Sequence, residues 1–302
     1  MNVQIGEKAT REKGWWLAHR WLLLRRLSQL SILTLFLLGP WAGLWIIKGN
    51  LSSSLLLDTV PMTDPFLFLQ ILASGFFAVT GLAVTGAAIV LVFYLLVGGR
   101  VFCSWVCPVN IVTDLAFWLR QKLAITGGLV FSRSTRYWIM GMVLVVSAVT
   151  GTLAYELINP VSLLHRGLFF GMGSGWGLII GLIAFDLAVS NRGWCSHLCP
   201  MGAFYSLVGT VSPIRVRADA RSKCDDCGEC FVVCPEPQIL PPVLKGEGKG
   251  IPPVVLSNVC TNCGRCIDIC GESVFEFGLR FNKNGVNEAS AKSSTHQPVT
   301  NE

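Results

Sequence analysis

The stretch CDDCGECFVVCP (residues 224–235) decides the fold of the C-terminal part of this 302-residue chain, and CTNCGRCIDIC (260–270) repeats its spacing. Each run reads C-x2-C-x2-C-x3-C. At this spacing three thiolates hold one [4Fe–4S] cluster, and the fourth cysteine reaches the other cluster. Proline follows the first run, whereas Gly271 follows the second. That position is not a ligand, so only the local chain direction differs.

Because the fourth cysteine of each run ligates the cluster of the other run, the sequence predicts two mixed ligand sets. The first is Cys224, Cys227, Cys230 and Cys270, and the second is Cys260, Cys263, Cys266 and Cys234. A zinc site more often has two cysteine pairs separated by a longer spacer. A disulfide framework needs an oxidising compartment. The sequence therefore predicts two [4Fe–4S] clusters and a role in electron transfer.

The composition is that of a membrane protein. The chain is 52% hydrophobic and 14% charged, with a mean hydropathy of +0.57, whereas soluble domains carry about 25% charged residues. A span needs about 20 apolar residues, and four stretches reach that length: 27–47, 71–97, 137–158 and 168–189. The net charge of +6 follows the loops and forms no basic-aromatic stripe, so we expect no nucleic-acid partner.

Lysine and arginine are concentrated before the first span, between the second and third, and after the fourth. They include Arg25, Arg26, Arg100, Arg120, Arg133, Arg136, Arg192, Arg215 and Arg217. The positive-inside rule then predicts that both termini lie in the cytoplasm. The first apolar run is too long for a cleavable signal peptide and has no small-residue cleavage site. The cytoplasm keeps thiols reduced, which suits iron–sulfur clusters.

The predicted architecture is an all-α polytopic membrane protein with four transmembrane helices and a C-terminal cytoplasmic α+β domain that resembles a ferredoxin. A basic N-terminal arm covers residues 1–26, and the membrane domain covers 27–212. The cluster domain covers 213–281, and a polar, disordered tail covers 282–302.

A second motif occurs twice, in FCSWVCPVN (102–110) and WCSHLCPMG (194–202). Each C-x3-C-P follows the second member of a predicted helix pair, so the membrane domain is an internal duplication. Pseudo-symmetry predicts that the two motifs meet at the cytoplasmic face. Their cysteines are Cys103, Cys107, Cys195 and Cys199. The spacing leaves open a further metal or iron–sulfur centre, redox-active thiols, or small buried cysteines at a helix start.

Together these motifs resemble the NapH family, the membrane ferredoxin-type subunits of periplasmic nitrate reductase systems. The likeness covers nearly the whole chain except the tail and extends to KGWW (13–16), HRWLLLRRL (19–27), NLSSSLLLDTVPMTDP (50–65), LINPVSL (157–163) and CPEPQIL (234–240). The cluster motifs alone also fit relatives from methylamine utilisation and nitrous-oxide reduction. The long segment 50–65 favours NapH.

The resemblance implies a multi-pass subunit of a quinol dehydrogenase in the bacterial inner membrane, rather than a stand-alone enzyme. Such a subunit takes electrons from membrane quinol and passes them through iron–sulfur clusters to a NapG-type periplasmic iron–sulfur protein. A NapC-type membrane cytochrome c then feeds the nitrate reductase. The alternative is a membrane iron–sulfur redox or maturation factor for a periplasmic reductase. A third reading has electrons moving inward from a cytoplasmic donor.

Quinol oxidation releases two protons and two electrons, so it needs an apolar pocket and a proton acceptor. Ionisable residues near membrane helices are the usual candidates. Glu156 and His165 flank the predicted turn between the third and fourth spans and are the expected quinol residues. Asp186, near the end of the fourth span, is expected to pair with Arg192 or Arg100 instead.

Overall fold

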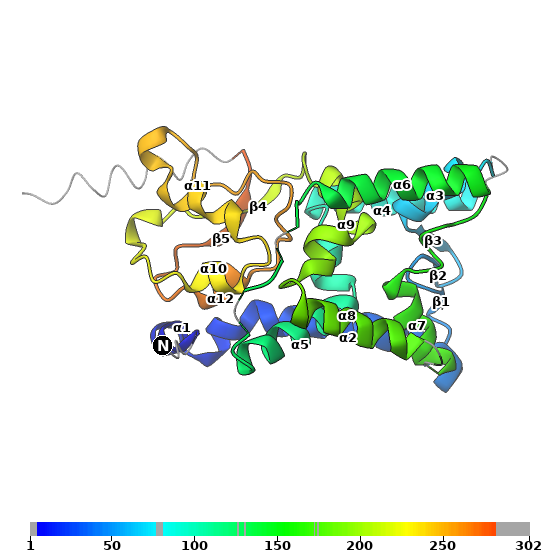
Figure 1. The fold of residues 1–302 in the computed structure, drawn as a ribbon, viewed down its shortest axis with the longest axis horizontal. Helices are drawn as coiled ribbons and strands as arrows, with labels where there is room; N and C mark the ends of the chain where they lie inside the picture. Colours follow the sequence, from blue (N-terminus) through cyan, green and yellow to red (C-terminus); the bar gives the residue numbers. More distant parts are fainter. Residues whose placement is uncertain are drawn as a thin grey trace, which may run out of the picture.

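The computed structural model describes residues 5–76, 81–125, 127–129, 131–171, 173 and 175–281. The molecule is elongated (Figure 1), with the cluster domain and the N-terminal helix at one end, a small sheet at the other, and long helices between them. The predicted disordered tail, 282–302, lies outside the described residues.

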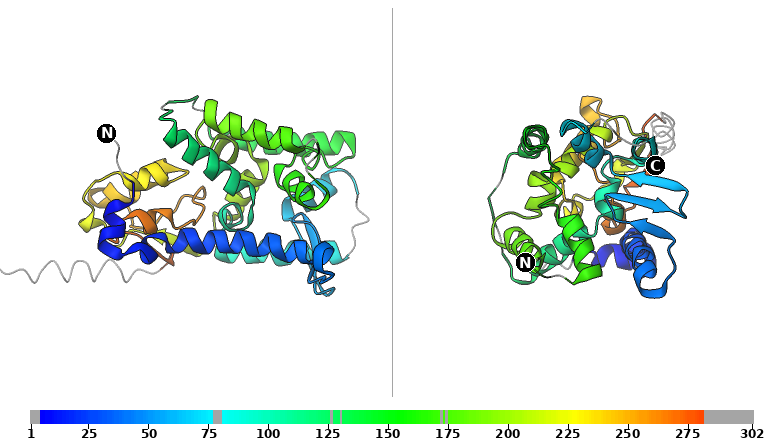
Figure 2. Two further views of the ribbon diagram at one scale, coloured as in Figure 1. Left: turned by 90° about the horizontal axis from the view of Figure 1, so that it is seen from below. Right: turned by 90° about the vertical axis from the view of Figure 1, so that its right-hand side faces the viewer.

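In the described part of the basic N-terminal arm, residues 5–26, the chain is largely helical. Helix α1 (Glu7–Lys13) is followed, after Gly14, by α2 (Trp15–Ala42). The 28 residues of α2 span about 42 Å at 1.5 Å per residue, and the helix runs along most of the molecule (Figure 2). It packs on the cluster domain near its start and on the sheet near its end.

Helix α2 is the one helix in the described part of the chain that is long and apolar enough to cross a membrane, judged by length and composition. Shorter apolar helices occupy the other predicted spans: α4 (Gly81–Val97), α6 (Thr135–Thr150) and α8 (Gly175–Ala188). The spans predicted at 71–97 and 168–189 each begin in a separate helix, α3 (Pro65–Ala73) or α7 (Pro160–Phe170). Four continuous transmembrane helices are therefore not found.

The two breaks have matching chemistry. Helices α3 and α7 each have proline in their first turn and an N-cap side chain, Asp64 and Asn159 respectively, which accepts a backbone N–H. Such caps satisfy a donor that the helix leaves free. After these helices the chain passes through Gly75 (φ 83°) and Gly171 (φ 86°), a backbone conformation that favours glycine and ends a helix.

The duplication is visible in the packing. In each repeat an apolar helix leads into a π-helical turn, η1 (Phe102–Val106) or η2 (Trp194–Leu198). Each turn is followed by a second helix, α5 (Val109–Lys122) or α9 (Pro200–Val208). Helix α5 packs on α8, and α9 packs on α4, so the last helix of each repeat lies against the apolar helix of the other repeat. In addition, α2 contacts η1 in the same way that α6 contacts η2.

A three-stranded antiparallel sheet corrects the all-α prediction for the membrane domain. Its order is β1 (Ile47–Gly49), β2 (Ser53–Leu56) and β3 (Val60–Thr63). Strand β3 packs on α4 at Gly86, where an added Cβ would lie 2.9 Å from Thr63 Oγ1. The missing side chain therefore lets the sheet close this end of the helices.

The cluster domain has the predicted α+β architecture. Strands β4 (Ile214–Arg217) and β5 (Glu276–Leu279) pair antiparallel. Helices α10 (Glu229–Val233) and α12 (Arg265–Ile269) lie inside the two cysteine runs, and α11 (Leu240–Lys245) covers one side. Short 3₁₀ turns occupy 221–223, 237–239 and 247–249. Because α10 packs on α12, the two runs lie side by side.

Gly99 lets the end of α4 approach α9, and we predict that Gly99→Ala destabilises the fold. An added Cβ would lie 1.9 Å from the Tyr205 carbonyl oxygen and 2.4 Å from the Gly209 nitrogen. Overpacking of this kind costs about 1–3 kcal/mol or more. Thermal unfolding in detergent measures the effect. The control is Gly141→Ala on α6, where an added Cβ meets nothing within 4 Å; an equal loss in both variants would contradict the prediction.

Candidate electron-transfer site

The structure brings the eight cysteines of the two runs together in the crossed arrangement. One cavity, of about 120 Å³, is lined by Cys224, Cys227, Cys230 and Cys270. A second, smaller cavity is lined by Cys234, Cys260, Cys263 and Cys266. Each cavity thus holds three cysteines of one run and the fourth of the other.

The thiols of each set influence one another's ionisation. Burial, together with neighbouring Cys227, Cys270 and Cys224, raises the pKa of Cys230 to about 12. Burial and the neighbouring Cys263 raise the pKa of Cys260 to about 11, against the effect of its backbone hydrogen bond at Asn262. Free thiols placed this way resist ionisation, whereas coordination to iron removes their protons.

Around the second cavity, arginines offset the effect of burial on the ionisation of the thiols. Burial opposes ionisation of Cys263, but Arg265 and Arg25 outweigh it and lower the pKa of the thiol. The second cavity is therefore suited to an anionic, thiolate-bound group. Among the described residues no three Cys, His, Asp or Glu side chains could hold a single metal ion. Four cysteines spread around a cavity fit a polynuclear cluster better.

The two C-x3-C-P motifs have the same backbone geometry. Each first cysteine lies within a π-helical turn, and each second cysteine is extended, with its N–H donating to the carbonyl of Phe102 or Trp194 at 2.9 Å. The extended residue before Pro108 or Pro200 follows from the steric restriction that proline imposes. The second motif then leads directly into α9, which has proline in its first turn.

The motifs meet in the interior, where the two repeats exchange helices. Burial and the nearby Cys103 together raise the pKa of Cys199 to about 11. Burial, Cys103 and Cys199 likewise raise the pKa of Cys107. Cys195 has the other three cysteines as charged neighbours. The four cysteines therefore form one group, in which Cys107 is buried and the others are partly buried; we call it the thiol tetrad: Cys103, Cys107, Cys195 and Cys199.

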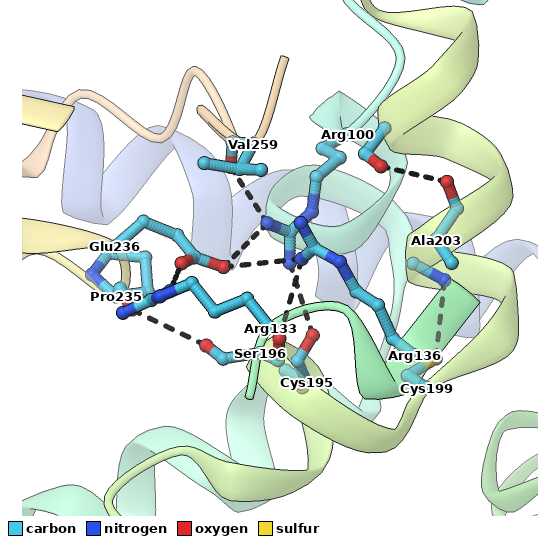
Figure 3. Close-up of polar contacts among 12 residues, drawn as sticks. Arg100, Arg133, Arg136, Cys195, Ser196, Cys199, Ala203, Pro235, Glu236 and Val259 are labelled. Carbon is cyan, nitrogen blue, oxygen red and sulfur yellow. Dashed lines mark hydrogen bonds and ion pairs between the residues drawn. The ribbon is translucent and has the colours of Figure 1, made fainter. Parts of the chain in front are cut away.

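A buried carboxylate links the tetrad to the second cavity (Figure 3). Glu236 follows Cys234 and Pro235 and has a side chain only 1% exposed. Its Oε1 lies 2.8 Å from Arg100 Nη1 and 3.5 Å from Arg136 Nη1, and its Oε2 pairs with Arg133. One negative charge thus faces three positive ones.

Arg100 spans the distance between the two groups of cysteines. It donates to the carbonyls of Val259 at 2.7 Å and Cys195 at 3.1 Å. It also hydrogen-bonds the thiol of Cys103, an effect that opposes the rise in the pKa of that thiol caused by burial. The Nε atoms of Arg100 and Arg136 are buried without a hydrogen-bond partner. The excess positive charge therefore favours anions on both sides.

A second carboxylate has the same surroundings. Asp114 on α5 pairs with Arg265 at 2.7 Å, with Arg192 at 3.3 Å and with Arg26. Burial opposes ionisation, but the three guanidinium groups outweigh it and lower the pKa of Asp114 to about 2. This cluster joins α2, α5 and the second cysteine run.

The structure corrects the expected partner of Asp186. Arg192 pairs with Asp114 and Arg100 with Glu236. Asp186 Oδ1 instead accepts the Trp194 N–H at 3.1 Å, at the start of η2. Many arginines that set the predicted orientation are buried in such contacts: Arg25, Arg100, Arg120, Arg136, Arg192, Arg215 and Arg217. The charge bias along the sequence is therefore also a feature of internal packing.

The two predicted quinol residues do not form a common site. Glu156 accepts hydrogen bonds from Asn159 at 3.0 Å and Ser52 at 3.3 Å, beside the N-terminus of α7. His165 is buried, with its ring centroid 5.0 Å from Phe36 and 4.4 Å from Phe169, and its Nε2 has no partner. No contact joins the two side chains in the described structure.

Sequence reasoning did not single out Glu236 and Asp114. A signal existed for both: an acid directly follows the Cys234–Pro235 pair, and an arginine precedes each C-x3-C-P motif at Arg100 and Arg192. A charged residue next to a cluster ligand is a candidate for a buried ion pair.

The geometry defines an electron-transfer protein of the ferredoxin type. A protein-family model described as "4Fe-4S binding domain" matches residues 71–126 and 168–217. These two segments contain the thiol tetrad and end before Cys224. No solved structure matches the chain.

Curated relatives match along most of the chain. The chain is 52% identical to ferredoxin-type protein NapH of Escherichia coli, covering 91% of this chain and 95% of the relative. It is 49% identical to NapH of Haemophilus influenzae, covering 92% and 96%. It is 50% identical to the methylamine utilization ferredoxin-type protein MauN of Paracoccus denitrificans, covering 93% and 98%. The chain belongs to this NapH/MauN family of ferredoxin-type proteins.

We predict that Glu236→Gln destabilises the protein strongly, because three arginines would then surround no negative charge. Removing one partner of a buried ion pair costs about 3–5 kcal/mol. Thermal unfolding and protease sensitivity of the cluster domain measure the loss. Glu247→Gln is the control, since Glu247 is 71% exposed in its pair with Arg221 and such pairs contribute about 0–1 kcal/mol. Equal stability of both variants would refute the structural role of Glu236.

Proposed function

We propose that the chain is the membrane electron-transfer subunit of a quinol dehydrogenase and passes electrons from membrane quinol through iron–sulfur centres toward a periplasmic nitrate reductase. One observation carries this proposal: Arg100 links the second four-cysteine cavity to the thiol tetrad, and the two cysteine cavities lie side by side. A row of thiolate groups from one end of the molecule into its interior suits stepwise electron transfer.

In this proposal the two cavities hold one [4Fe–4S] cluster each. Cys224, Cys227, Cys230 and Cys270 ligate the first, and Cys260, Cys263, Cys266 and Cys234 ligate the second. Each cluster, when bound, carries one electron at a time. The protein holds the two sites close together, since the thiol of Cys266 has Cys230 of the other set among its charged neighbours.

The tetrad, in the same proposal, ligates a third centre. Four neighbouring thiols fit such a group, and Arg100 and Arg136 supply the positive charge that stabilises their anionic form. A purely structural cluster of neutral thiols would leave two of the three arginines at Glu236 without a counter-charge, at a large cost in a buried site.

Exposed apolar surface supports a multi-pass membrane position. Large side chains project from several helices, among them Val149 (82% exposed), Trp138 (79%), Trp41 (77%) and Ile180 (61%). Soluble monomers rarely expose such extensive apolar surface. We therefore place α2, α4, α6 and α8 in the inner membrane, with both termini in the cytoplasm. The N-terminal helix and the cluster domain share one end of the molecule (Figure 1), which agrees with this orientation.

The proposed partners are a NapG-type periplasmic iron–sulfur protein and a NapC-type membrane cytochrome c. The segment 50–65, which forms β2 and β3, is the feature that favours the nitrate system over methylamine utilization. An iron–sulfur redox or maturation factor is the second candidate, because the same clusters could supply electrons to cofactor assembly.

We predict that a short-chain quinol reduces the clusters of the intact protein in membranes. The measurement is the electron paramagnetic resonance signal of reduced [4Fe–4S] clusters, with dithionite as the positive control. Clusters that stay oxidised with quinol but become reduced with dithionite would contradict the quinol dehydrogenase proposal and favour the second candidate.

The iron content tests the third centre. Two cubane clusters hold about eight iron atoms and three hold about twelve. We predict that the double variant Cys103→Ser, Cys195→Ser loses about four iron atoms per chain and a matching amount of acid-labile sulfide. A wild-type content of about eight, unchanged in the variant, would show that the tetrad holds no cluster.

A further inference from the structure

A cavity of about 200 Å³ lies between the sheet and the first C-x3-C-P motif. Its walls come from α2, the sheet, α4, η1 and α9, and are largely apolar. They include Phe36, Met62, Val90, Phe102 and Val106. Ile32, Met62 and Val90 are partly exposed, so the cavity wall reaches the apolar surface between α2 and α4. Neither Glu156 nor His165 lines it.

One carboxylate faces this apolar space. Asp64 is 5% exposed and caps α3, with Oδ2 accepting the Leu67 N–H at 3.0 Å. Its Oδ1 accepts a hydrogen bond from the hydroxyl of Tyr205 at 2.8 Å. No arginine or lysine pairs with it in the described structure, which distinguishes it from Asp114 and Glu236. Burial raises the pKa of Asp64 to about 6, despite the hydrogen bond from Tyr205.

The cavity also lies beside the first C-x3-C-P motif. Phe102 and Val106 line it, and each directly precedes a tetrad cysteine, Cys103 or Cys107. The ring of Tyr205 stacks on Phe102 with centroids 5.0 Å apart. A ligand in the cavity would thus lie next to a proton acceptor on one side and an electron acceptor on the other.

We infer that this cavity binds the aromatic head of the quinol, with Asp64 as the proton acceptor and an iron–sulfur centre held by the thiol tetrad as the first electron acceptor. The inference rests on the proposed function and deepens it. Pockets that enclose drug-sized ligands have about 300–1,000 Å³. The smaller volume here suits a single substituted ring, with the isoprenoid tail left in the lipid.

The reaction balances with these groups. Oxidation of one quinol to quinone breaks two O–H bonds and releases two protons and two electrons. The carboxylate of Asp64 takes one proton, and the other leaves to solvent. The two electrons would be taken up one at a time by iron–sulfur centres held by the tetrad and by the two cluster cavities.

Glu156 lies outside the cavity, on the other side of Ser52. The Asp64 N–H donates to the Ser52 carbonyl at 2.8 Å, and the Ser52 hydroxyl lies 3.3 Å from Glu156 Oε1. Glu156 is partly exposed, so it is a second carboxylate on this side of the sheet, next to the surface. The charged or titratable groups around Asp64 are Glu156, Tyr94, Tyr155 and Tyr205.

The test compares variants by stopped-flow reduction of the clusters with a short-chain quinol. Asp64→Asn keeps an N-cap side chain and an acceptor for Tyr205 but removes the base. It should slow the limiting rate by about 100-fold or more with little change in KM. Val90→Trp fills the cavity and should abolish saturation by quinol. Asp58→Asn is the matched control, since Asp58 is an exposed residue of the same sheet region paired with Lys48. Dithionite should reduce all variants alike.

Photolabelling with an azidoquinone separates failure of the cavity from failure of the proposed function. Labelled peptides should contain cavity residues of β3 and α4 in the wild type and lose the label in Val90→Trp. If quinol fails to reduce wild-type clusters but the cavity is labelled, the quinol dehydrogenase function fails and the binding site stands. If wild-type clusters are reduced while Asp64→Asn and Val90→Trp behave normally, or if the label falls elsewhere, the cavity assignment is wrong.

Discussion

The buried pairing of Glu236 with Arg100, Arg133 and Arg136 holds the cluster domain and the helical domain together. The carboxylate comes from the second residue after a cluster cysteine, and the arginines come from both repeats of the helical domain. A single carboxylate cannot neutralise three guanidinium groups, so the remaining positive charge requires anions nearby. The second cluster cavity and the thiol tetrad lie on either side of it. The ion cluster therefore connects the two domains and also creates the electrostatic environment that thiolate-bound centres need.

The sequence predicted the cluster-binding cysteines better than it predicted where the helices begin and end. The crossed cysteine sets were predictable because ligand spacing is a local property, and Cys234 and Cys270 each end a short helix that packs on the other. The meeting of the two C-x3-C-P motifs was predictable from the repeat. The breaks before α4 and α8 were not, because an apolar run looks continuous whether or not glycine ends a helix within it. The β1–β3 sheet was also missed, because its strands are only three or four residues long and mix polar with apolar residues, so no regular period marks them.

The acidic residues show where sequence reasoning has its limit. Glu156 and His165 were selected for their position near predicted span ends; no hydrogen bond or ion pair joins them in the described structure, and their role stays a prediction. Asp64 has the same sequence context, yet it alone combines burial, a tyrosine partner and an apolar cavity. That combination depends on α9 crossing to α4, a contact between two halves of the chain that no local pattern reveals. The elements that carry these sites, first the sheet, then α4 and α9, then α10 and α12, follow one another along the long axis of the molecule (Figure 1).

The direct measurement of the proposed electron path is the arrival of electrons at the ferredoxin-type clusters when the tetrad is removed. Rapid-freeze electron paramagnetic resonance would follow the Cys103→Ser, Cys195→Ser protein in membranes after mixing with a short-chain quinol. The expected result is loss of the quinol-dependent signal of both clusters, with full reduction by dithionite retained. Reduction by quinol at the wild-type rate in this variant would show that electrons do not pass through the tetrad.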